Sequence, residues 1–209
     1  MRLIVIGCEY SGKTTLIDAL MAWGSKSGIH FHLDDHFSVP DQYFLSSDDQ
    51  QAMLAMPPTI KERFQRFQIY YHISVLKNHG DCLLGGFHVE EAIYGGRYYY
   101  PGHAWPAYQR KIETELPSDT ILLLLQASPE VIRRRMEVSP HLYPIVPPED
   151  VAAVSKEFEA DYRASWIERK FTIDTSDLSP DDLIQTFRRQ VVPYLDTRDL
   201  LRFQSVIGH

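Results

Sequence analysis

The feature that most restricts how this chain can fold is an eight-residue segment close to its start. Residues 7–14 read GCEYSGKT and match the pattern G-x-x-x-x-G-K-[ST] at every fixed position. An apolar run precedes the segment at 3–6, and a stretch with helical spacing follows at 14–23. A buried strand, a glycine-rich turn and a helix in this order form a loop whose backbone N–H groups bind phosphate. The segment therefore predicts a nucleotide-binding α/β protein.

Each position of this loop has a chemical role in the prediction. Gly7 and Gly12 allow the turn, Lys13 reaches the β- and γ-phosphates, and the Thr14 hydroxyl is a ligand for Mg²⁺. The competing interpretation is a glycine turn with an exposed lysine, but the strand before it and the helix after it favour nucleotide binding. The expected nucleotide contacts in this segment are Gly7, Tyr10, Ser11, Gly12, Lys13, Thr14 and Thr15.

Apolar runs of strand length alternate with helical patterns along the rest of the chain, which is typical of βαβ units and a parallel sheet. We expect one domain, 1–209, with the fold class of the P-loop NTPases: a three-layer α/β/α sandwich around a five-stranded parallel sheet. The expected strands are 3–6, 29–33, 81–84, 120–126 and 171–174. The expected helices are 14–23, 59–78, 107–115, 129–136, 149–169 and 180–194.

The amino-acid composition limits the partners and the cellular surroundings that we expect for the protein. The chain of 209 residues has 21 Lys and Arg against 28 Asp and Glu, a formal net charge of −7. This balance makes duplex nucleic acid an unlikely main partner, because neutralising its phosphates requires a basic face. Two cysteines exclude a disulfide framework. No apolar run approaches the ~20 residues of a membrane span. We therefore expect a soluble cytoplasmic protein that does not enter membranes.

Further segments extend the motif into a family resemblance. They are Asp34-Asp35 after the second expected strand, 85–95 (GGFHVEEAIYG) after the third, 128–135 (SPEVIRRR) after the fourth, 158–162 (FEADY), and 173–176 (IDTS) at the fifth. Together with the loop at 7–14, they resemble the thymidylate kinases and deoxynucleoside kinases over nearly the whole chain. The resemblance implies a kinase that transfers the γ-phosphate of ATP, with Mg²⁺, to a small nucleoside, nucleotide or related acceptor.

The resemblance also implies roles on the donor side of the site. Asp34 or Asp35 is expected to deprotonate the acceptor hydroxyl, and Asp34 also to assist Thr14 with the metal. A lid at about 133–150 is expected to close over the γ-phosphate through Arg134, with Arg133 second and Arg135 as the alternative. The base of ATP is expected near two residues that follow the last strand, Thr175 and Ser176.

The acceptor is expected beside the long helix 59–78. There Arg63 and Arg66 are candidates to bind an acceptor phosphate or sugar, and Phe67 or Tyr70 to stack on a base. In the alternative interpretation Phe64, Phe67, Tyr71 and Val75 form a core-facing stripe, since their spacing is helical. Two further acceptor contacts are expected after the third strand, at His88 and Glu91.

One departure from the family pattern leaves alternatives open. The family has an acidic residue and an arginine where this chain has Gly85-Gly86. Three explanations of this departure are open. In the first, Asp34 or Asp35 binds the metal with help from Glu90 or Glu91. In the second the acceptor is unusual, and in the third the protein binds nucleotide without turnover. Two other acceptors are considered: a non-nucleoside alcohol and a modified base in nucleic acid. For the modified base, the aromatic stretch 94–105 offers stacking surfaces. The family resemblance also suggests a homodimer.

Overall fold

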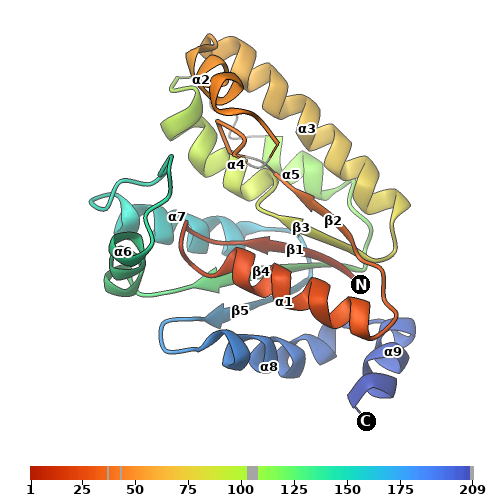
Figure 1. Ribbon diagram of the computed structural model, residues 1–209. Helices are drawn as coiled ribbons and strands as arrows, with labels where there is room; N and C mark the ends of the chain where they lie inside the picture. Colours follow the sequence, from red (N-terminus) through yellow and green to blue (C-terminus); the bar gives the residue numbers. More distant parts are fainter. Residues whose placement is uncertain (37, 43, 103–107, 208–209) are drawn as a thin grey trace.

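The computed structural model describes residues 1–36, 38–42, 44–102 and 108–207, without the side chains of 35, 108–110 and 204–207. Its centre is one sheet of five parallel strands in the order β2-β3-β1-β4-β5. The strands are β1 (Arg2–Ile6), β2 (His32–Asp35), β3 (Cys82–Gly85), β4 (Thr120–Gln126) and β5 (Arg169–Asp174). Figure 1 shows them side by side, with helices above and below.

The helices connect these strands and complete the chain. They are α1 (Lys13–Lys26), α2 (Ser47–Ala55), α3 (Pro58–Asn78), α4 (His88–Tyr94), the π-helix η1 (Gly95–Tyr99), α5 (Tyr108–Glu113), α6 (Pro129–Val138), α7 (Val151–Ala164), α8 (Pro180–Val191), the 3₁₀ helix η2 (Val192–Tyr194) and α9 (Thr197–Ile207). Among the described residues, no helix combines the length and the apolar character that crossing a bilayer requires.

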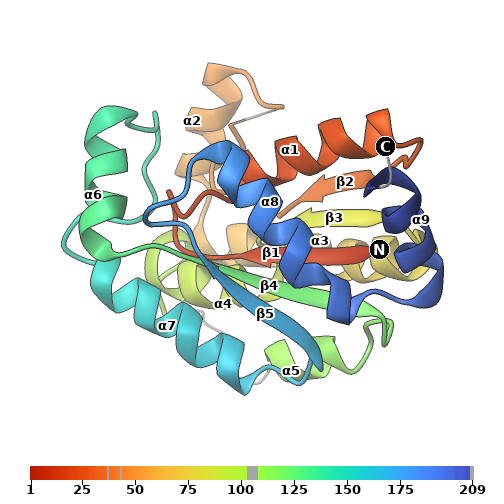
Figure 2. The same cartoon turned by 90° about the horizontal axis from the view of Figure 1, so that it is seen from below.

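The sheet buries a different apolar cluster on each of its two faces. Successive strand residues point to opposite faces, so Ile4 and Ile6 pack under α3, α4 and α7, whereas Leu3 and Val5 pack against α1, α8 and α9. Figure 2 shows the second group of helices crossing in front of the strands. This three-layer α/β/α arrangement confirms the expected fold class.

Several stretches differ from the expectation. The second strand is 32–35 rather than 29–33: Ile29 and Phe31 are buried but lie before the strand begins. The predicted helix 149–169 ends at Ala164, because β5 already begins at Arg169.

The helices α2, α4 and α9 were not predicted. Both α2 and α4 are shorter than ten residues, and the glycines on either side of α4 at 85–86 and 95–96 suggest a loop. In the aromatic stretch that begins at 94, Tyr94, Tyr99 and Tyr100 are buried.

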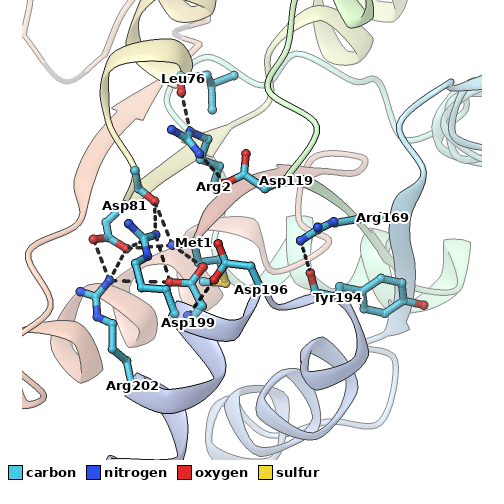
Figure 3. A network of polar contacts seen from close by, with 12 residues as sticks. Met1, Arg2, Leu76, Asp81, Asp119, Arg169, Tyr194, Asp196, Asp199 and Arg202 are labelled. Carbon is cyan, nitrogen blue, oxygen red and sulfur yellow. Dashed lines mark hydrogen bonds and ion pairs between the residues drawn. The ribbon is translucent and has the colours of Figure 1, made fainter.

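The amino-terminal edge of the sheet is joined by an ionic network, drawn in Figure 3. The α-ammonium of Met1 lies 2.8 Å from Asp81 Oδ1 and 2.9 Å from Asp199 Oδ2, and it donates a hydrogen bond to Gly80 O. Arg202 donates to both carboxylate oxygens of Asp81, at 2.9 Å each. The network connects the starts of β1 and β3 to α9, on the side of the sheet opposite the loop at 7–14.

Candidate active site

The loop at 7–14 leaves β1 at the carboxyl edge of the sheet and has the backbone that its sequence requires. Gly7 and Gly12 have φ values of 151° and 99°, and Tyr10 adopts a left-handed conformation at 63°. A Cβ atom on Gly7 would lie only 2.4 Å from Leu125 O and 2.6 Å from Ser11 Oγ. The loop therefore packs directly on β4, and glycine at position 7 is a steric requirement.

Lys13, the first residue of α1, folds its side chain back over this loop. Its ammonium donates a hydrogen bond to Gly7 O at 2.6 Å and lies 3.4 Å from Glu90 Oε2. Thr14 and Thr15, in the same first turn of the helix, are exposed to solvent. The lysine and the two hydroxyl groups are thus available to an anion at the helix N-terminus, where the helix dipole also attracts negative charge.

A sharp turn brings Glu90 to this lysine. Gly86 has a φ of +75°, and a Cβ atom there would lie 3.0 Å from the Glu90 carboxylate. Phe87, which is completely buried, also has a positive φ, +81°. A non-glycine residue in this conformation is strained, and such strain often accompanies a functional site. The Gly85-Gly86 pair therefore carries no acidic side chain itself, but it allows α4 to present a carboxylate to Lys13.

Of the three arginines of α6, Arg135 contacts the phosphate-binding loop. Its guanidinium donates hydrogen bonds to Tyr10 O at 2.9 Å, to Thr175 O at 2.7 Å and to Thr175 Oγ1 at 3.1 Å. Burial lowers the pKa of Arg135, and neighbouring Arg134 acts in the same direction. The sequence favoured Arg134 and ranked Arg135 as the alternative; the fold brings Arg135 to the loop.

The other two arginines point elsewhere. Arg133 donates from Nε to Pro148 O at 2.9 Å, in the connection that follows α6. Arg134 is exposed and borders an open pocket of about 310 Å³ beside the loop. The residues lining this pocket are Tyr10, Arg134, Arg135, Val138, Ser139 and His141.

The residues expected near the nucleotide base have structural contacts of their own. Thr175 is buried, and its hydroxyl donates to Ser11 O at 2.9 Å, which joins the end of β5 to the phosphate-binding loop. Ser176 accepts a hydrogen bond from Ser128 N and donates one to Asp174. Thr175 thus supports the backbone of the loop, whereas Ser176 joins the start of α6 to the end of β5.

Asp34 points from β2 towards α3. Its Oδ2 atom lies 3.5 Å from His72 Nδ1 and 3.9 Å from His32 Nε2. The Asp34 charge and its hydrogen bond with Tyr71 raise the pKa of that phenol. Asp35 pairs with Gly85 at the last position of the ladder, but its side chain lies outside the described residues. The described contacts of Asp34 are therefore with the histidines and tyrosine around α3.

Glu91 forms a buried pair with His36, which follows β2. His36 Nε2 lies 2.9 Å from Glu91 Oε2. Burial raises the pKa of Glu91 well above its usual value, an effect that the nearby Glu62 carboxylate increases. Burial also lowers the pKa of His36 to about 3. Burial therefore shifts the pKa of each group in the direction that favours its uncharged form.

The long helix α3 contributes fewer site residues than expected. Arg66 is paired with Glu62 on the same helix, and Arg63 is exposed. Phe67 and Tyr70 are 70% and 49% exposed, so they do not line a buried acceptor site, and Phe67 is not a core residue either. The buried face consists of Gln65, Gln68, Ile69, His72, Ile73, Val75 and Leu76.

His88 is placed differently from its predicted role. It is buried at the start of α4, with Nε2 2.9 Å from Glu113 Oε1. Glu113 also accepts from Trp166 N, and although burial alone would raise its pKa, the hydrogen bonds from His88 and Trp166 lower it. This pair fastens α4 to α5, so the expectation of a substrate contact at His88 is corrected.

Several side chains that contact the loop or belong to it lie outside the site set drawn from the sequence. Arg135 was an alternative, Glu90 was considered only as an assisting residue, and Glu9 was not considered. Glu90 and Glu91 are adjacent in the sequence, which gives no indication of which carboxylate faces Lys13. That choice depends on the turn at Gly86, which no sequence period reveals.

Comparisons with known proteins rest on structure. No family model matches the chain, and no curated protein sequence does. The YorR protein of Bacillus subtilis, solved with phosphorylated GDP, superimposes with a TM-score of 0.62 at 15% identity, over 91% of this chain and 95% of that one. Deoxyadenosine kinase from M. mycoides with bound dATP superimposes with a TM-score of 0.59 at 16% identity, over 91% and 99%.

A second structure of the same deoxyadenosine kinase, with the products dCMP and dCDP, gives a TM-score of 0.60 at 15% identity, over 91% of this chain and 98% of that one. These similarities extend over nearly the whole length of both partners, while sequence identity is low. Together with the loop, the parallel sheet and its strand order, they establish the architecture. The chain has the fold of the P-loop nucleoside and nucleotide kinases.

Proposed function

We propose that the protein is an ATP- and Mg²⁺-dependent phosphotransferase of the nucleoside and nucleotide kinase type. The observation that carries this proposal is the convergence of Lys13, Glu90 and Arg135 on one phosphate-binding loop, from three different helices. Phosphoryl transfer depends on positioning and on neutralising charge that spreads over the phosphoryl oxygens. A cradle of N–H groups, a lysine and an arginine provide these functions.

Each group of the chain has a proposed task. The backbone from Gly7 to Thr15 binds the phosphates, and Lys13 leaves its contact with Gly7 O to reach the β- and γ-phosphates. Arg135 holds the loop and Arg134 faces the nucleotide. Arg133 holds the connection that follows α6 through its hydrogen bond to Pro148 O. The single domain 1–209 and the lid at about 133–150 remain part of this proposal. The base of ATP lies between Thr175, Ser176 and the arginines of α6.

The residues around the loop also fit a magnesium ion. The described residues contain no group of three His, Cys, Asp or Glu side chains that would form a protein cage. Mg²⁺ is commonly held by one or two protein oxygens together with substrate phosphates and water. The Thr14 hydroxyl and the Glu90 carboxylate beside Lys13 are the proposed protein ligands, with Asp34 as the alternative. When bound, the ion would neutralise charge on the phosphates.

For the acceptor, the proposal assigns the space between the end of β2, α3 and α4. Candidate contacts there are Arg66 with Glu62, and the buried Glu91–His36 pair. A carboxylate of Asp34, Asp35 or Glu90 is the proposed general base. Glu90 contacts Lys13, whereas Asp34 contacts histidines. We therefore favour Glu90 over Asp34 as the carboxylate that acts near the phosphates.

Two rival functions remain in the proposal. One is a kinase for a modified base in nucleic acid or for a non-nucleoside alcohol, since Gly85-Gly86 departs from the family pattern. The other is a nucleotide-binding module without turnover. The buried state of Tyr94, Tyr99 and Tyr100 removes most of the aromatic stretch that would stack on a nucleic acid; His103 and Trp105 lie outside the described residues.

The test is ADP release from Mg·ATP with a panel of nucleosides, nucleoside monophosphates, non-nucleoside alcohols and DNA with modified bases. Lys13→Ala serves as the blank, and Glu90→Gln and Asp34→Asn separate the acidic residues. Acceptor-dependent release that Lys13→Ala abolishes supports the kinase and identifies its acceptor. Tight ATP binding without release for any acceptor would favour the binding module and contradict the kinase.

We also propose a homodimer through the outer face of α3. That face carries large apolar side chains at helical spacing that are about half or more exposed: Ile60, Phe64, Phe67 and Tyr71. A contiguous exposed apolar patch on a helix commonly marks a protein interface. A second copy with the same stripe supplies a matching surface through twofold symmetry.

A further inference from the structure

The first half of the phosphate-binding loop contains a buried acid. Glu9 Oε1 lies 2.6 Å from His141 Nδ1, and Glu9 Oε2 accepts hydrogen bonds from Ile145 N and Val146 N at 2.9 Å each. All three donors belong to the connection between α6 and α7. We call residues 139–148 the clasp segment. The Glu9 side chain is thus completely occupied by a segment more than 130 positions away in the sequence.

The neighbouring loop residue makes a second set of contacts with the clasp segment. The Tyr10 hydroxyl accepts a hydrogen bond from His141 N at 2.8 Å, and the two rings stack with centroids 4.1 Å apart. The loop side of the contact is itself fixed, because Glu9 N donates to the buried Tyr94 hydroxyl at 2.9 Å. Tyr10 and His141 also form one wall of the pocket beside Arg134 and Arg135.

The far end of the connection is anchored as well. The Tyr98 hydroxyl donates to Asp150 Oδ2 at 2.8 Å, Arg97 approaches the same carboxylate, and Arg133 binds Pro148 O. Between these anchors Leu142 is 75% exposed, whereas Val146 is buried in the core and Ile145 packs against it. In Figure 1 the connection is a loop between α6 and α7. Polar contacts of Glu9 therefore act together with the apolar packing of Ile145 and Val146 in placing this segment.

The contacts of Glu9 matter because the loop is proposed to bind phosphates. A carboxylate with free oxygens inside a phosphate-binding loop would repel the phosphates. Here two backbone N–H groups and an imidazole take up its hydrogen-bonding capacity, which draws the charge towards the clasp segment and away from the cradle. Breaking these contacts would both free the segment and leave a buried charge without partners, so the two events are energetically linked.

We propose that Glu9 is a positioning residue: it fastens residues 139–148 to the phosphate-binding loop, closes one wall of the pocket, and slows release of a bound nucleotide. The fastening follows from the contacts alone, whereas the effect on release rests on the proposed nucleotide binding. The two parts are therefore measured separately.

The fastening is measured by amide hydrogen exchange at Ile145 and Val146 in the protein without nucleotide. Glu9→Ala should accelerate both amides by about tenfold or more, because they lose a charged acceptor, while β4 amides keep their rates. Glu9→Gln keeps an oxygen acceptor and should give a smaller increase. Glu137→Ala, an exposed glutamate on α6, is the matched control and should change neither amide. Equal rates in Glu9→Ala and the unmodified protein would overturn the proposal.

The effect on release is measured with a fluorescent ATP analogue and Mg²⁺ by stopped flow. Glu9→Ala should increase the dissociation rate constant by about tenfold and leave the association rate within about threefold, since typical interface changes act on dissociation. Tyr10→Phe, which keeps the ring but loses the hydroxyl acceptor, should have a smaller effect in the same direction. An unchanged dissociation rate in both variants would refute the positioning role.

A failure of the proposed function gives a different pattern. If the unmodified protein does not bind the analogue, nucleotide binding and the effect on release are both overturned, while amide exchange still decides the fastening. If Glu9→Ala does not fold, two other variants test the same contacts. His141→Asn changes the clasp segment, and Tyr10→Phe changes the loop. Faster exchange at Ile145 in those variants supports the fastening, and unchanged exchange contradicts it.

Discussion

At the scale of single residues, the site depends on backbone conformations that few side chains permit. Gly7 lies with its missing Cβ against Leu125 O, and Gly86 with its missing Cβ against the Glu90 carboxylate. Phe87 combines a positive φ with a completely buried ring. The candidate site is thus built on close approaches of backbone, and small changes there should have large effects.

Gly7→Ala should destabilise the protein by roughly 2–5 kcal/mol, the sum of a positive-φ penalty and a clash with the β4 backbone. Gly28 is the matched control, because it has a φ of +67° but no atom within 4 Å of its added Cβ. Gly28→Ala should cost only ~1–2 kcal/mol. Urea unfolding of both variants measures the difference, and equal losses would contradict the steric explanation.

The Asp81 carboxylate gives a prediction for acid stability. Burial alone would raise its pKa, but hydrogen bonds from the Met1 ammonium and Arg202, together with their charges, lower it. The unfolded chain then binds the proton more readily, so this stabilisation is present above the ordinary value of 3.8 and is lost as the pH falls through the native pKa. Asp81→Asn should therefore be less stable at neutral pH and show a weaker acid dependence in urea unfolding.

Asp18→Asn, on the exposed face of α1, is the control for this variant and should follow the unmodified protein at every pH. If Asp81→Asn lost the same stability at acidic and neutral pH, the ion pairs of Figure 3 would not be the source of the acid dependence.

At the scale of elements, buried polar pairs join segments that apolar packing alone leaves loosely defined. His88 and Glu113 connect α4 to α5, and His36 and Glu91 connect the end of β2 to α4. The π-helix η1 follows α4 directly, and a Cβ on Gly95 would lie 2.9 Å from Glu91 Oε1 and 2.4 Å from the Tyr100 hydroxyl. The position of Glu91 thus depends on three neighbouring elements.

The Glu91–His36 pair predicts a stability that declines in alkaline solution. Because burial raises the native pKa of Glu91, its contribution is complete below the ordinary value of 4.5 and is lost as the pH rises through the native pKa. Each pKa unit corresponds to ~1.4 kcal/mol. Glu91→Gln has no proton to lose, so its free energy of unfolding should fall less than that of the unmodified protein as the pH rises above the ordinary value of 4.5.

His36 acts in the opposite direction. Its native pKa of about 3 lies below the ordinary 6.5, so its contribution is present above 6.5 and is lost as the pH falls towards 3. Urea unfolding across the pH series measures the alkaline effect of Glu91 and the acidic effect of His36, with Glu168→Gln, an exposed residue just before β5, as the control. A Glu91→Gln variant with the same alkaline slope as the unmodified protein would show that Glu91 is already ionised in the native state.

At the scale of the whole molecule, the two edges of the sheet carry different groups. The amino edge holds the Met1 network and α9, and the carboxyl edge holds the loop at 7–14, Lys13, Glu90 and Arg135. Outside the sheet, α3 carries exposed apolar side chains at 60, 64, 67 and 71. This is the surface that we propose for the homodimer.

Phe67→Glu should convert the proposed dimer into a monomer, since a charge in the apolar stripe must be desolvated when the two copies meet. Sedimentation velocity at micromolar protein measures the mass. Leu201→Glu, which changes an equally exposed apolar residue on α9, is the control and should stay dimeric. A monomeric unmodified protein at these concentrations would contradict the interface.

Much of the architecture follows from local sequence. The run 120–126 is a strand with the predicted bounds, because a continuous apolar segment must be buried on both faces. Ser128 caps α6 as expected, with its hydroxyl accepting from Val131 N. The loop at 7–14 is identifiable because its chemistry requires fixed residue types at fixed spacing. These features depend on near neighbours in the chain.

The composition of the site depends on contacts between distant segments. The helical spacing of Phe64, Phe67 and Tyr71 suggests a buried stripe, yet α3 buries Gln65, Gln68 and His72, and His72 faces Asp34 on β2. Among three consecutive arginines, a helical period cannot select the one whose guanidinium meets Tyr10 O. Burial and hydrogen bonding across the sheet make that selection.

The sequence by itself therefore determined the glycine-rich loop at 7–14, the alternation of strands and helices, and the parallel sheet, since each arises from short-range patterning. Only the tertiary structure decided that Glu90 meets Lys13, that Arg135 supports the loop, and that Glu9 fastens residues 139–148. Each of these contacts joins residues from different elements. Their geometry comes from how helices pack on the sheet and from the turn at Gly86, which local residue patterns do not specify.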